Sequence, residues 1–198
     1  MFNLLLNFDL RITQFINSLL PHNPFLDLFF SFFSLRGNSI LIWLVIILLL
    51  VIFEEKRDKK FIIYFLIIIA AVYITNDIFL KNLFHRSRPL PAEKRSLERR
   101  ANSDESSSKV SLGGPSSTDC PSDFSFPSGH AATAFASAAI LSFFDKKRRG
   151  GYYLIAFLIA LSRVYLFCHF FFDVVAGGLI GWLTTKIILI GQKTHSVE

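Results

Sequence analysis

Apolar residues in this sequence gather in long blocks that short polar breaks separate. The blocks cover residues 25–53, 61–81, 128–144, 152–167 and 169–190. The first block is interrupted at Arg36 and Gly37, where we expect a bend. Inside the blocks, apolar and polar residues do not alternate as they do in a half-buried strand. Because the best blocks approach the length of about 20 residues with which a helix crosses a bilayer, we predict an all-α, polytopic membrane bundle.

Residues 2–20 have a different pattern, in which polar residues recur every three or four positions. These residues are Asn3, Asn7, Arg11, Gln14 and Ser18, and Leu, Ile and Phe surround them. The spacing predicts an amphipathic helix. Such a helix either lies in the membrane interface or lines the bundle as a weak span. The bundle therefore has five spans without this helix and six with it.

Length and composition indicate the number of domains and the class of protein. The chain has 198 residues, enough for one compact domain over residues 1–198, and 52% of them are hydrophobic, with 23 Phe. The net charge of +6 would fit nucleic acid, but the sequence carries no nucleic-acid-binding motif. Its basic residues lie in short loops between apolar blocks, as orientation signals do. The start of the chain lacks the basic segment and small-residue cleavage site of a signal peptide.

The loops predict how the bundle is oriented. EEKRDKK (54–60) and DKKRRGG (145–151) hold most of the loop Lys and Arg, so we place both in the cytoplasm. The long segment 89–126 is rich in Ser, and its charges of both signs nearly cancel. We expect it to be an outer loop, either a plain flexible connector, which its composition favours, or a lid over a site.

The two cysteines, Cys120 and Cys168, have neither metal-ligand spacing nor a CxxC arrangement. A disulfide would require both to lie near the same membrane face. We expect two unpaired thiols.

Ionisable residues gather at the ends of the apolar blocks. They are Lys81, His85, Arg86, Arg88, His130, Arg163, His169 and Asp173. The predicted topology brings all of them to the outer end of the bundle. Ionisable groups within or at the rim of a membrane bundle are costly, and they usually mark a functional site. Two histidines and an aspartate among Lys and Arg side chains form a cationic pocket that suits a phosphate.

The stretch PSGH at 127–130 starts one of these helices. Ser128 is a good N-cap residue, and Gly129 lets a ligand approach the backbone. The amides of such a first turn bind anions, and His130 stands at the same end. A capped helix with an incidental histidine is the alternative.

His169 and Asp173 are four residues apart, which places them on one face of a helix. The carboxylate can then accept a hydrogen bond from one ring nitrogen, which leaves the other unprotonated, as a nucleophile requires. The alternative is a structural ion pair between packed helices.

Taken together, the residues resemble the type 2 phosphatidic acid phosphatases (PAP2), which share their site with vanadium haloperoxidases. The family pattern is K-x6-RP, then PSGH, then SR-x5-H-x3-D. Here KNLFHRSRP supplies Lys81 and Arg88, PSGH supplies Ser128, Gly129 and His130, and SRVYLFCHFFFD supplies Arg163, His169 and Asp173.

The resemblance implies a role for each residue. His169 attacks phosphorus, Asp173 orients its ring, and His130 protonates the leaving oxygen and then activates water. The phosphate-binding residues would be Lys81, Arg88, Ser128, Gly129 and Arg163. No metal and no other cofactor is implied. Among the neighbours, we expect Asp77 to pair with Lys81, His85 and Arg86 to face water at the membrane surface, and Ser162 to act indirectly.

These roles describe a membrane lipid phosphatase of a bacterial plasma membrane with its site on the outer face. The resemblance to small bacterial members favours undecaprenyl diphosphate as substrate, converted to undecaprenyl phosphate. Lipid A, phosphatidylglycerophosphate and phosphatidate are alternatives. A lipid phosphotransferase that uses the same phosphohistidine is an alternative of another class.

Overall fold

The computed structural model of the chain describes all residues except 1, 35, 54–59, 90–119, 121–122 and 196–198. The described part is built of helices and connecting segments, with no strand in it. The all-α prediction is confirmed. Most of the expected outer loop at 89–126 lies outside the described residues, so its role stays a prediction.

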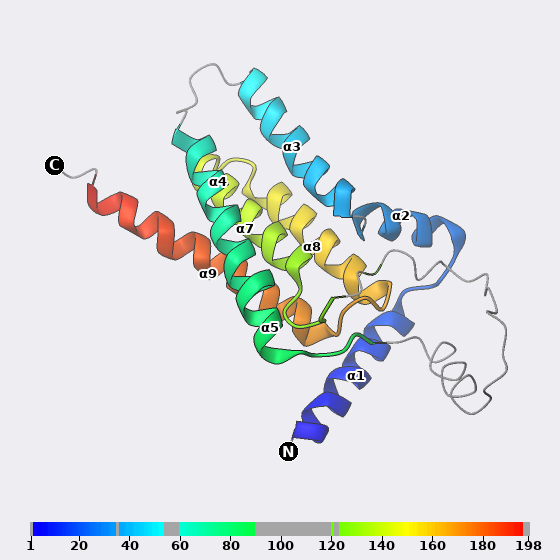
Figure 1. Cartoon of the computed structure of the whole chain (residues 1–198). Coiled ribbons are helices and arrows are strands. Elements are labelled where there is room, and N and C mark those ends of the chain that lie inside the picture. The colour runs from blue at the N-terminus through cyan, green and yellow to red at the C-terminus, as the bar shows by residue number, and fades with distance from the viewer. Residues whose placement is uncertain (1, 35, 54–59, 90–119, 121–122, 196–198) are drawn as a thin grey trace, which may run out of the picture.

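The helices follow the predicted blocks closely (Figure 1). They are α1 (Phe2–Leu19), α2 (Pro24–Ser34), α3 (Arg36–Phe53), α4 (Lys60–Tyr73), the π-helix η1 (Ile74–Leu80), α5 (Lys81–Phe84), α7 (Gly129–Phe144), α8 (Arg149–Tyr165) and α9 (Phe171–His195). The bend expected near Arg36 lies between α2 and α3, which meet at 70°.

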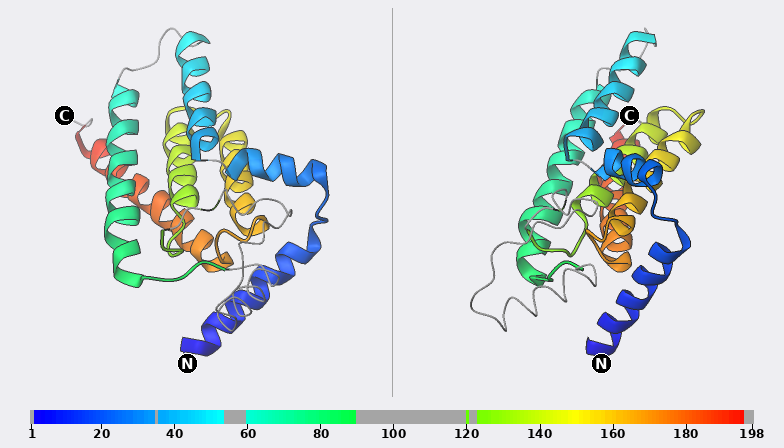
Figure 2. Two further views of the ribbon diagram at one scale, coloured as in Figure 1. Left: turned by 45° about the vertical axis from the view of Figure 1, so that its right-hand side comes forward. Right: turned by 90° about the vertical axis from the view of Figure 1, so that its right-hand side faces the viewer.

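Helix α7 occupies the middle of the bundle, where it packs against α4, α8 and α9 (Figure 2). Its buried residues are mostly alanines, which leave room for neighbouring helices to come close. Helix α9 uses this room with two glycines one turn apart. A Cβ at Gly177 would collide with the backbone of Ser128, and one at Gly181 with the backbone of Ala132. Small residues at matching positions therefore set how closely α9 approaches the start of α7.

The helix that begins with α4 changes its winding halfway along. Residues 74–80 form a π-helix, a form that is often found at functional sites. At this point the buried Asn76 donates from Nδ2 to the carbonyl of Pro127 at 3.4 Å. A Cβ on Gly129 would lie 2.8 Å from Oδ1 of Asp77. The π-helix thus lies directly against the PSGH segment.

Helix α1 meets the bundle with a polar side that the sequence pattern did not single out. Asp9, Thr13 and Asn17 are buried, whereas Arg11, Gln14 and Ser18 of the predicted stripe are exposed. Thr13 Oγ1 accepts from the amide of Phe171 at 3.0 Å, and Asp9 Oδ1 accepts from the amide of Phe172 at 3.1 Å. These side chains satisfy amides in the first turn of α9, which have no partner within the helix. The contact fixes where α9 begins.

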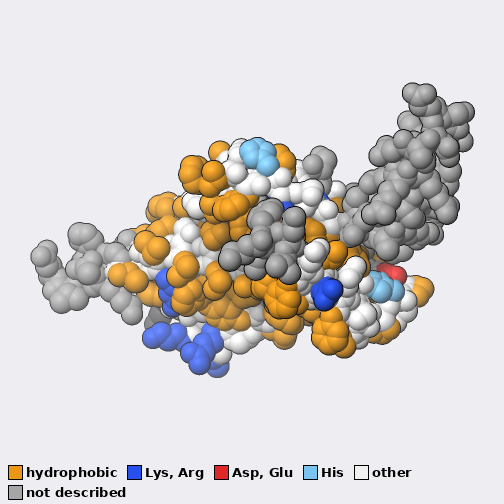
Figure 3. Space-filling view, turned by 90° about the horizontal axis from the view of Figure 1, so that it is seen from below, with side chains coloured by type: hydrophobic (Ala, Val, Ile, Leu, Met, Phe, Trp, Pro, Cys, Tyr) orange, Lys and Arg blue, Asp and Glu red, His pale blue; other side chains and the backbone are white. Residues whose placement is uncertain are grey.

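Two described helices are long and apolar enough to cross a membrane, over residues 61–84 and 171–190, and the bent pair of α2 and α3 would make a third. Helix α7 is apolar but has only 16 residues. Many large hydrophobic side chains are exposed along these helices. Seen from below Figure 1, hydrophobic side chains cover much of the described surface, and Lys and Arg side chains gather at a few places on it (Figure 3). Such a surface suits contact with lipid.

Candidate active site

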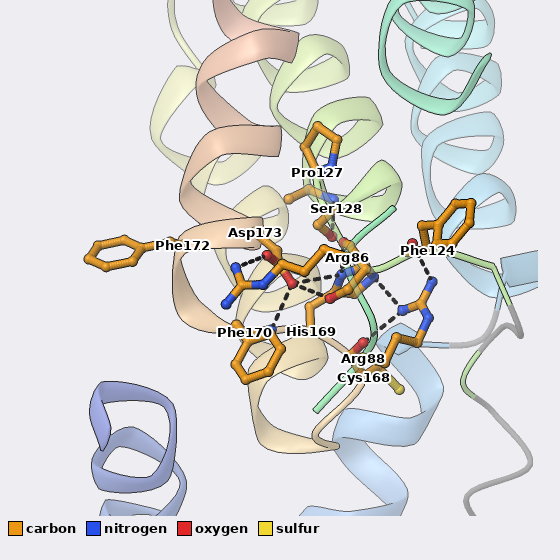
Figure 4. Close-up of polar contacts among 12 residues, drawn as sticks. Arg86, Arg88, Phe124, Pro127, Ser128, Cys168, His169, Phe170, Phe172 and Asp173 are labelled. Carbon is orange, nitrogen blue, oxygen red and sulfur yellow. Dashed lines mark hydrogen bonds and ion pairs between the residues drawn. The ribbon is translucent and has the colours of Figure 1, made fainter. Parts of the chain in front are cut away.

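Three chain segments meet at one end of the bundle, opposite the basic turn between α7 and α8 (Figure 1). They are the segment after α5, the residues leading into α7, and the turn between α8 and α9. Ser128 donates from its backbone amide to the carbonyl of Asp173 at 2.9 Å, and Ser125 donates likewise to the carbonyl of Arg86 at 2.7 Å. These bonds join the predicted motif segments into one cluster (Figure 4).

His169 lies buried in a tight turn between α8 and α9. Phe167 takes a left-handed backbone conformation with φ of 53°, and the amides of Cys168 and His169 both donate to the carbonyl of Arg163, at 3.0 and 3.1 Å. A bulky residue in that conformation is uncommon and often accompanies a functional site. The turn directs the imidazole into the cluster instead of along α9.

The hydrogen bonds of His169 fix which ring nitrogen carries the proton. Nδ1 lies 2.7 Å from the carbonyl oxygen of Ser125, which can only accept, so Nδ1 donates. Nε2 lies 2.8 Å from Nη1 of Arg88, which can only donate, so Nε2 keeps its lone pair. Burial lowers the pKa of His169 well below its ordinary value, and the charges of Arg88, Arg163 and Lys81 lower it further. The ring is therefore neutral, with its basic nitrogen directed at a cation.

Asp173 does not make the direct hydrogen bond to His169 that the four-residue spacing predicts. Its Oδ2 lies 3.7 Å from Nδ1 of His169, whose proton goes to Ser125 instead. The carboxylate accepts from the Ser125 hydroxyl, from the amide of Phe170 at 3.0 Å and from Nη1 of Arg86 at 2.5 Å. Asp173 therefore binds the side chain of Ser125, whose backbone carbonyl orients the His169 ring, and it makes no direct hydrogen bond to the imidazole.

Arg86 is only partly exposed and is held between two carboxylates, so the expectation that it faces water at the membrane surface is wrong. Its Nη2 lies 2.7 Å from Asp9 of α1 and its Nη1 2.5 Å from Asp173 of α9, and its guanidinium lies 4.0 Å from the centre of the Phe170 ring. The chain after α5 carries Arg86 between the carboxylate of Asp9 in α1 and that of Asp173 in the first turn of α9. The sequence feature that could have predicted this contact is Asp9, a lone acidic residue among apolar neighbours, which needs a cation as partner when it is buried.

Lys81 and Arg88 come together as the motif spacing predicts, but a carboxylate joins them. Lys81 lies 2.5 Å from Asp77, which confirms that pair, and 2.6 Å from Oδ2 of Asp123. Nη2 of Arg88 lies 2.5 Å from Oδ1 of Asp123. Burial alone would raise the pKa of Asp123, but hydrogen bonds and charge from Lys81 and Arg88 lower it to about 2. Asp123 is thus ionised. It lies outside the three sequence motifs, and so the motifs do not assign it to the site.

The start of α7 has the cap that PSGH predicts. The Ser128 side chain accepts from the amide of Ala131 at 3.5 Å, a weak bond by length. Ser128 is fully buried, and Gly129 and His130 form the first residues of the helix. Because Ser128 also bonds to Asp173, this helix end stands beside the carboxylate and the turn that holds His169.

Arg163 is fully buried and reaches toward α2. Its Nη1 donates to the carbonyl of Ser34 at 2.8 Å and also contacts the Ser34 hydroxyl. Burial lowers the pKa of His169 most, and the positive charge of Arg163 adds to the lowering. Ser162 donates to the carbonyl of Ile159 in its own helix at 2.7 Å, in keeping with an indirect role. His85 ends α5, and its ring lies 4.5 Å from that of Phe124.

Cys120 and Cys168 form a disulfide, so the expectation of two unpaired thiols is wrong. Their Cα atoms are 5.3 Å apart although 48 positions separate them in the sequence. Cys168 precedes His169, and Cys120 lies three residues before Asp123. Spacing alone could not reveal this pair, since it is the fold that brings Cys120 next to the turn that holds His169.

Comparisons with known proteins identify the family of the chain. The family model of the PAP2 superfamily matches residues 60–196. The crystal structure of Aquifex aeolicus LpxE is similar with a TM-score of 0.60 and 30% identity, over 91% of this chain and 93% of that one. The crystal structure of a transmembrane PAP2-type phosphatidylglycerolphosphate phosphatase from Bacillus subtilis has a TM-score of 0.63 and 21% identity, over 97% and 88% of the two chains.

A curated relative matches over a shorter stretch. The bacitracin transport permease protein BcrC of Bacillus licheniformis is 33% identical over 84 residues. The match spans 38% of this chain and 41% of the relative, which is less than half of either.

Proposed function

The chain belongs to the PAP2 superfamily, and from this premise we propose that it is a membrane phosphatase that acts on phosphoesters of lipids and forms a phosphohistidine on His169. One observation carries the proposal. The imidazole of His169 has Nδ1 tied to a carbonyl and Nε2 unprotonated beside the guanidinium of Arg88. That is the tautomer a histidine nucleophile needs, placed next to a cation that binds phosphate.

The reaction would run in two displacements. In the first, Nε2 of His169 attacks phosphorus, the bond to the leaving oxygen breaks, and His130 gives that oxygen a proton. In the second, His130 takes a proton from water, whose oxygen attacks the phosphohistidine, and the P–N bond breaks to release inorganic phosphate. Lys81, Arg88, Arg163 and the first turn of α7 at Ser128 and Gly129 would stabilise the charge on the equatorial oxygens.

Asp173 supports both displacements from a distance. Its carboxylate holds Ser125, whose carbonyl fixes the His169 ring, and its negative charge offsets the positive charge that the ring gains when it bonds to phosphorus. Cations and backbone amides supply the electrostatic stabilisation in this scheme. We therefore expect EDTA to leave the rate unchanged, and a loss of rate that Mg²⁺ restores would overturn this part of the scheme.

We place the active site at the outer face of a bacterial plasma membrane, in a bundle of five or six spans. The site lies at the end of the bundle opposite the turn that holds Lys146, Lys147, Arg148 and Arg149, and basic turns mark the cytoplasmic side. A lipid could then present its phosphate at headgroup level while its tails remain in the bilayer.

Undecaprenyl diphosphate is the substrate we favour. Small size, the amphipathic helix α1 and the run DFSFPSGHAATAFA resemble bacterial family members with that substrate. Lipid A and phosphatidylglycerophosphate are the second candidates.

A phosphate-release panel with purified protein in detergent tests the assignment. Undecaprenyl diphosphate, lipid A, phosphatidylglycerophosphate and phosphatidate are each supplied alone, with His169→Ala as the matched inactive variant. We expect phosphate from undecaprenyl diphosphate at the highest kcat/KM and none from the variant. Faster release from another lipid would reassign the substrate. Loss of the substrate's phosphate only when a lipid alcohol is added, with the phosphate recovered on that alcohol and none released, would replace the hydrolase by a phosphotransferase.

A further inference from the structure

The carboxylate of Asp123 sits on the two cations that the family pattern assigns to the phosphate. Its Oδ2 lies 2.6 Å from Nζ of Lys81, and its Oδ1 lies 2.5 Å from Nη2 of Arg88. Arg88 also donates from Nε to the backbone carbonyl of Asp123 at 2.9 Å. Two oxygens of one anion thus bridge two cations, which is the way a phosphate would bind them.

The carboxylate is the accessible member of this cluster. The side chain of Asp123 is 36% exposed, against 7% for Lys81 and 11% for Arg88. The cations have other anchors, since Lys81 bonds to Asp77 and Arg88 donates to the carbonyl of Cys168 at 2.7 Å. Asp123 belongs to no helix. A rotation of its side chain would uncover both cations, whereas neither cation can leave without losing its other partners.

We propose that Asp123 is a resident counter-anion, which occupies Lys81 and Arg88 in the empty site and makes the site selective for terminal phosphates over phosphodiesters. The inference rests on the proposed function, because it takes these two cations to be phosphate ligands. It adds a specificity-determining residue that lies outside the three signature motifs.

The selectivity follows from charge. A terminal phosphate carries a charge between about −1.5 and −2 at pH 7 and has three acceptor oxygens. A phosphodiester carries a single negative charge and has two free oxygens, so it offers these cations little more than the carboxylate already does. Bilayer phospholipids are phosphodiesters, and they surround the site in large excess at the same depth. An ionised Asp123 would exclude them while it yields to a more highly charged terminal phosphate.

Arg88, which binds Asp123, also contacts the proposed nucleophile His169. Nη1 of Arg88 contacts Nε2 of His169 while Nη2 of the same guanidinium holds Asp123. In the empty site, the cation that would bind substrate therefore covers the attacking nitrogen. A phosphate that takes over Arg88 from Asp123 would turn the guanidinium toward phosphorus and expose the Nε2 lone pair. Binding of a terminal phosphate would then be coupled to exposure of the Nε2 lone pair of His169.

Equilibrium binding to Asp123→Asn tests the proposal without turnover. Asparagine keeps the shape of the side chain but not its charge. We expect the Kd for inorganic phosphate and for vanadate, measured by calorimetry, to fall about tenfold or more. Phosphatidylglycerol, a phosphodiester without a terminal phosphate, should become a competitive inhibitor of lipid phosphate hydrolysis. Asp123→Glu, which keeps the charge, should stay close to the wild-type protein in both measurements.

Asp145→Asn serves as the control, since Asp145 lies in the turn at the opposite end of the bundle and should leave the Kd for phosphate unchanged. A thermal melt establishes that each variant is folded. Equal or weaker phosphate binding by folded Asp123→Asn, with no inhibition by phosphatidylglycerol, would overturn the inference. If the wild-type protein binds neither anion and releases phosphate from no lipid, the proposed function fails instead, so the two failures are distinguishable.

Discussion

Nδ1 of His169 donates to the backbone carbonyl of Ser125 at 2.7 Å, and this bond sets the state of the candidate nucleophile. A backbone carbonyl cannot donate, so the proton on Nδ1 is fixed and Nε2 stays basic. The carboxylate of Asp173 accepts a hydrogen bond from the Ser125 hydroxyl and lies 3.7 Å from Nδ1 of His169, without a direct hydrogen bond to it. The orientation of the imidazole thus depends on the segment that leads into PSGH as well as on α9.

Ser125→Ala and Asp173→Asn separate direct from indirect orientation of His169. Ser125→Ala removes the hydroxyl that Asp173 holds but keeps the carbonyl, so the loop carrying that carbonyl should loosen. We expect kcat to fall about tenfold or more with a smaller change in KM, and Asp173→Asn to have a larger effect because it also leaves Arg86 with half its counter-charge. Steady-state kinetics in detergent measures both. A wild-type kcat for Ser125→Ala would mean that Asp173 acts on His169 directly.

His169 should take up a proton only at a lower pH than an ordinary histidine does. Burial and the charges of three neighbouring cations lower its pKa, so the native ring should stay neutral well below pH 6.5. The unfolded chain would bind a proton there, with a pKa of about 6.5. This residue's contribution to stability is therefore complete above pH 6.5 and is lost as the pH falls below it. NMR of histidine-labelled protein checks this, with His169→Gln to assign the signal, and half-protonation at pH 6.5 or above would contradict it.

The close approach of α7 and α9 should be sensitive to a single methyl group. Gly181→Ala would drive a Cβ into the backbone of Ala132, so helices rather than flexible side chains must move apart. We expect a loss of about 1–3 kcal/mol in the free energy of unfolding and a lower kcat, because the same helices carry His130 and Asp173. Gly151→Ala is the matched control, since nothing lies within 4 Å of its added Cβ. Thermal unfolding of the two variants should differ, and equal midpoints would refute the packing argument.

The disulfide between Cys120 and Cys168 should contribute measurably to stability. It closes a loop of 48 positions, for which loop-closure entropy gives about 4 kcal/mol as an upper range. Cys120→Ser, Cys168→Ser and the double variant should all lose the same amount, because each removes one cross-link. Reductant should lower the melting temperature of the wild-type protein but not that of the double variant. Single variants as stable as the wild-type protein would show that the bond contributes nothing.

The sequence alone predicted the helices well, and the three motifs identified side chains that the fold brings to one end of the bundle. Apolar blocks mark α4, α7, α8 and α9 because helices that cross a bilayer are predominantly apolar. Lys81 and Arg88, and likewise His169 and Asp173, follow from fixed motif spacings. The count of five or six spans rests on composition, whereas length and hydropathy alone support two or three among the described helices.

What the sequence did not reveal are contacts between segments far apart in the chain. Arg86 meets Asp9 across 77 positions, and Asp123 meets Lys81 across 42. Neither pair leaves a periodic signal, since both depend on how irregular segments cross the ends of helices. The π-helix at residues 74–80 is also invisible to a pattern with a period of 3.6 residues.

The phosphorylated residue is the most direct test of the account. His130→Ala should slow the attack of water on the intermediate by about 10²–10⁴-fold, so that phosphoenzyme accumulates. The variant is mixed with lipid substrate labelled in its terminal phosphate, quenched in alkali to preserve phosphohistidine, digested and mapped by mass spectrometry. The account predicts the label on Nε2 of His169 and none on the His130→Ala/His169→Ala double variant. Label on another residue, or a burst of product with no label on the protein, would contradict it.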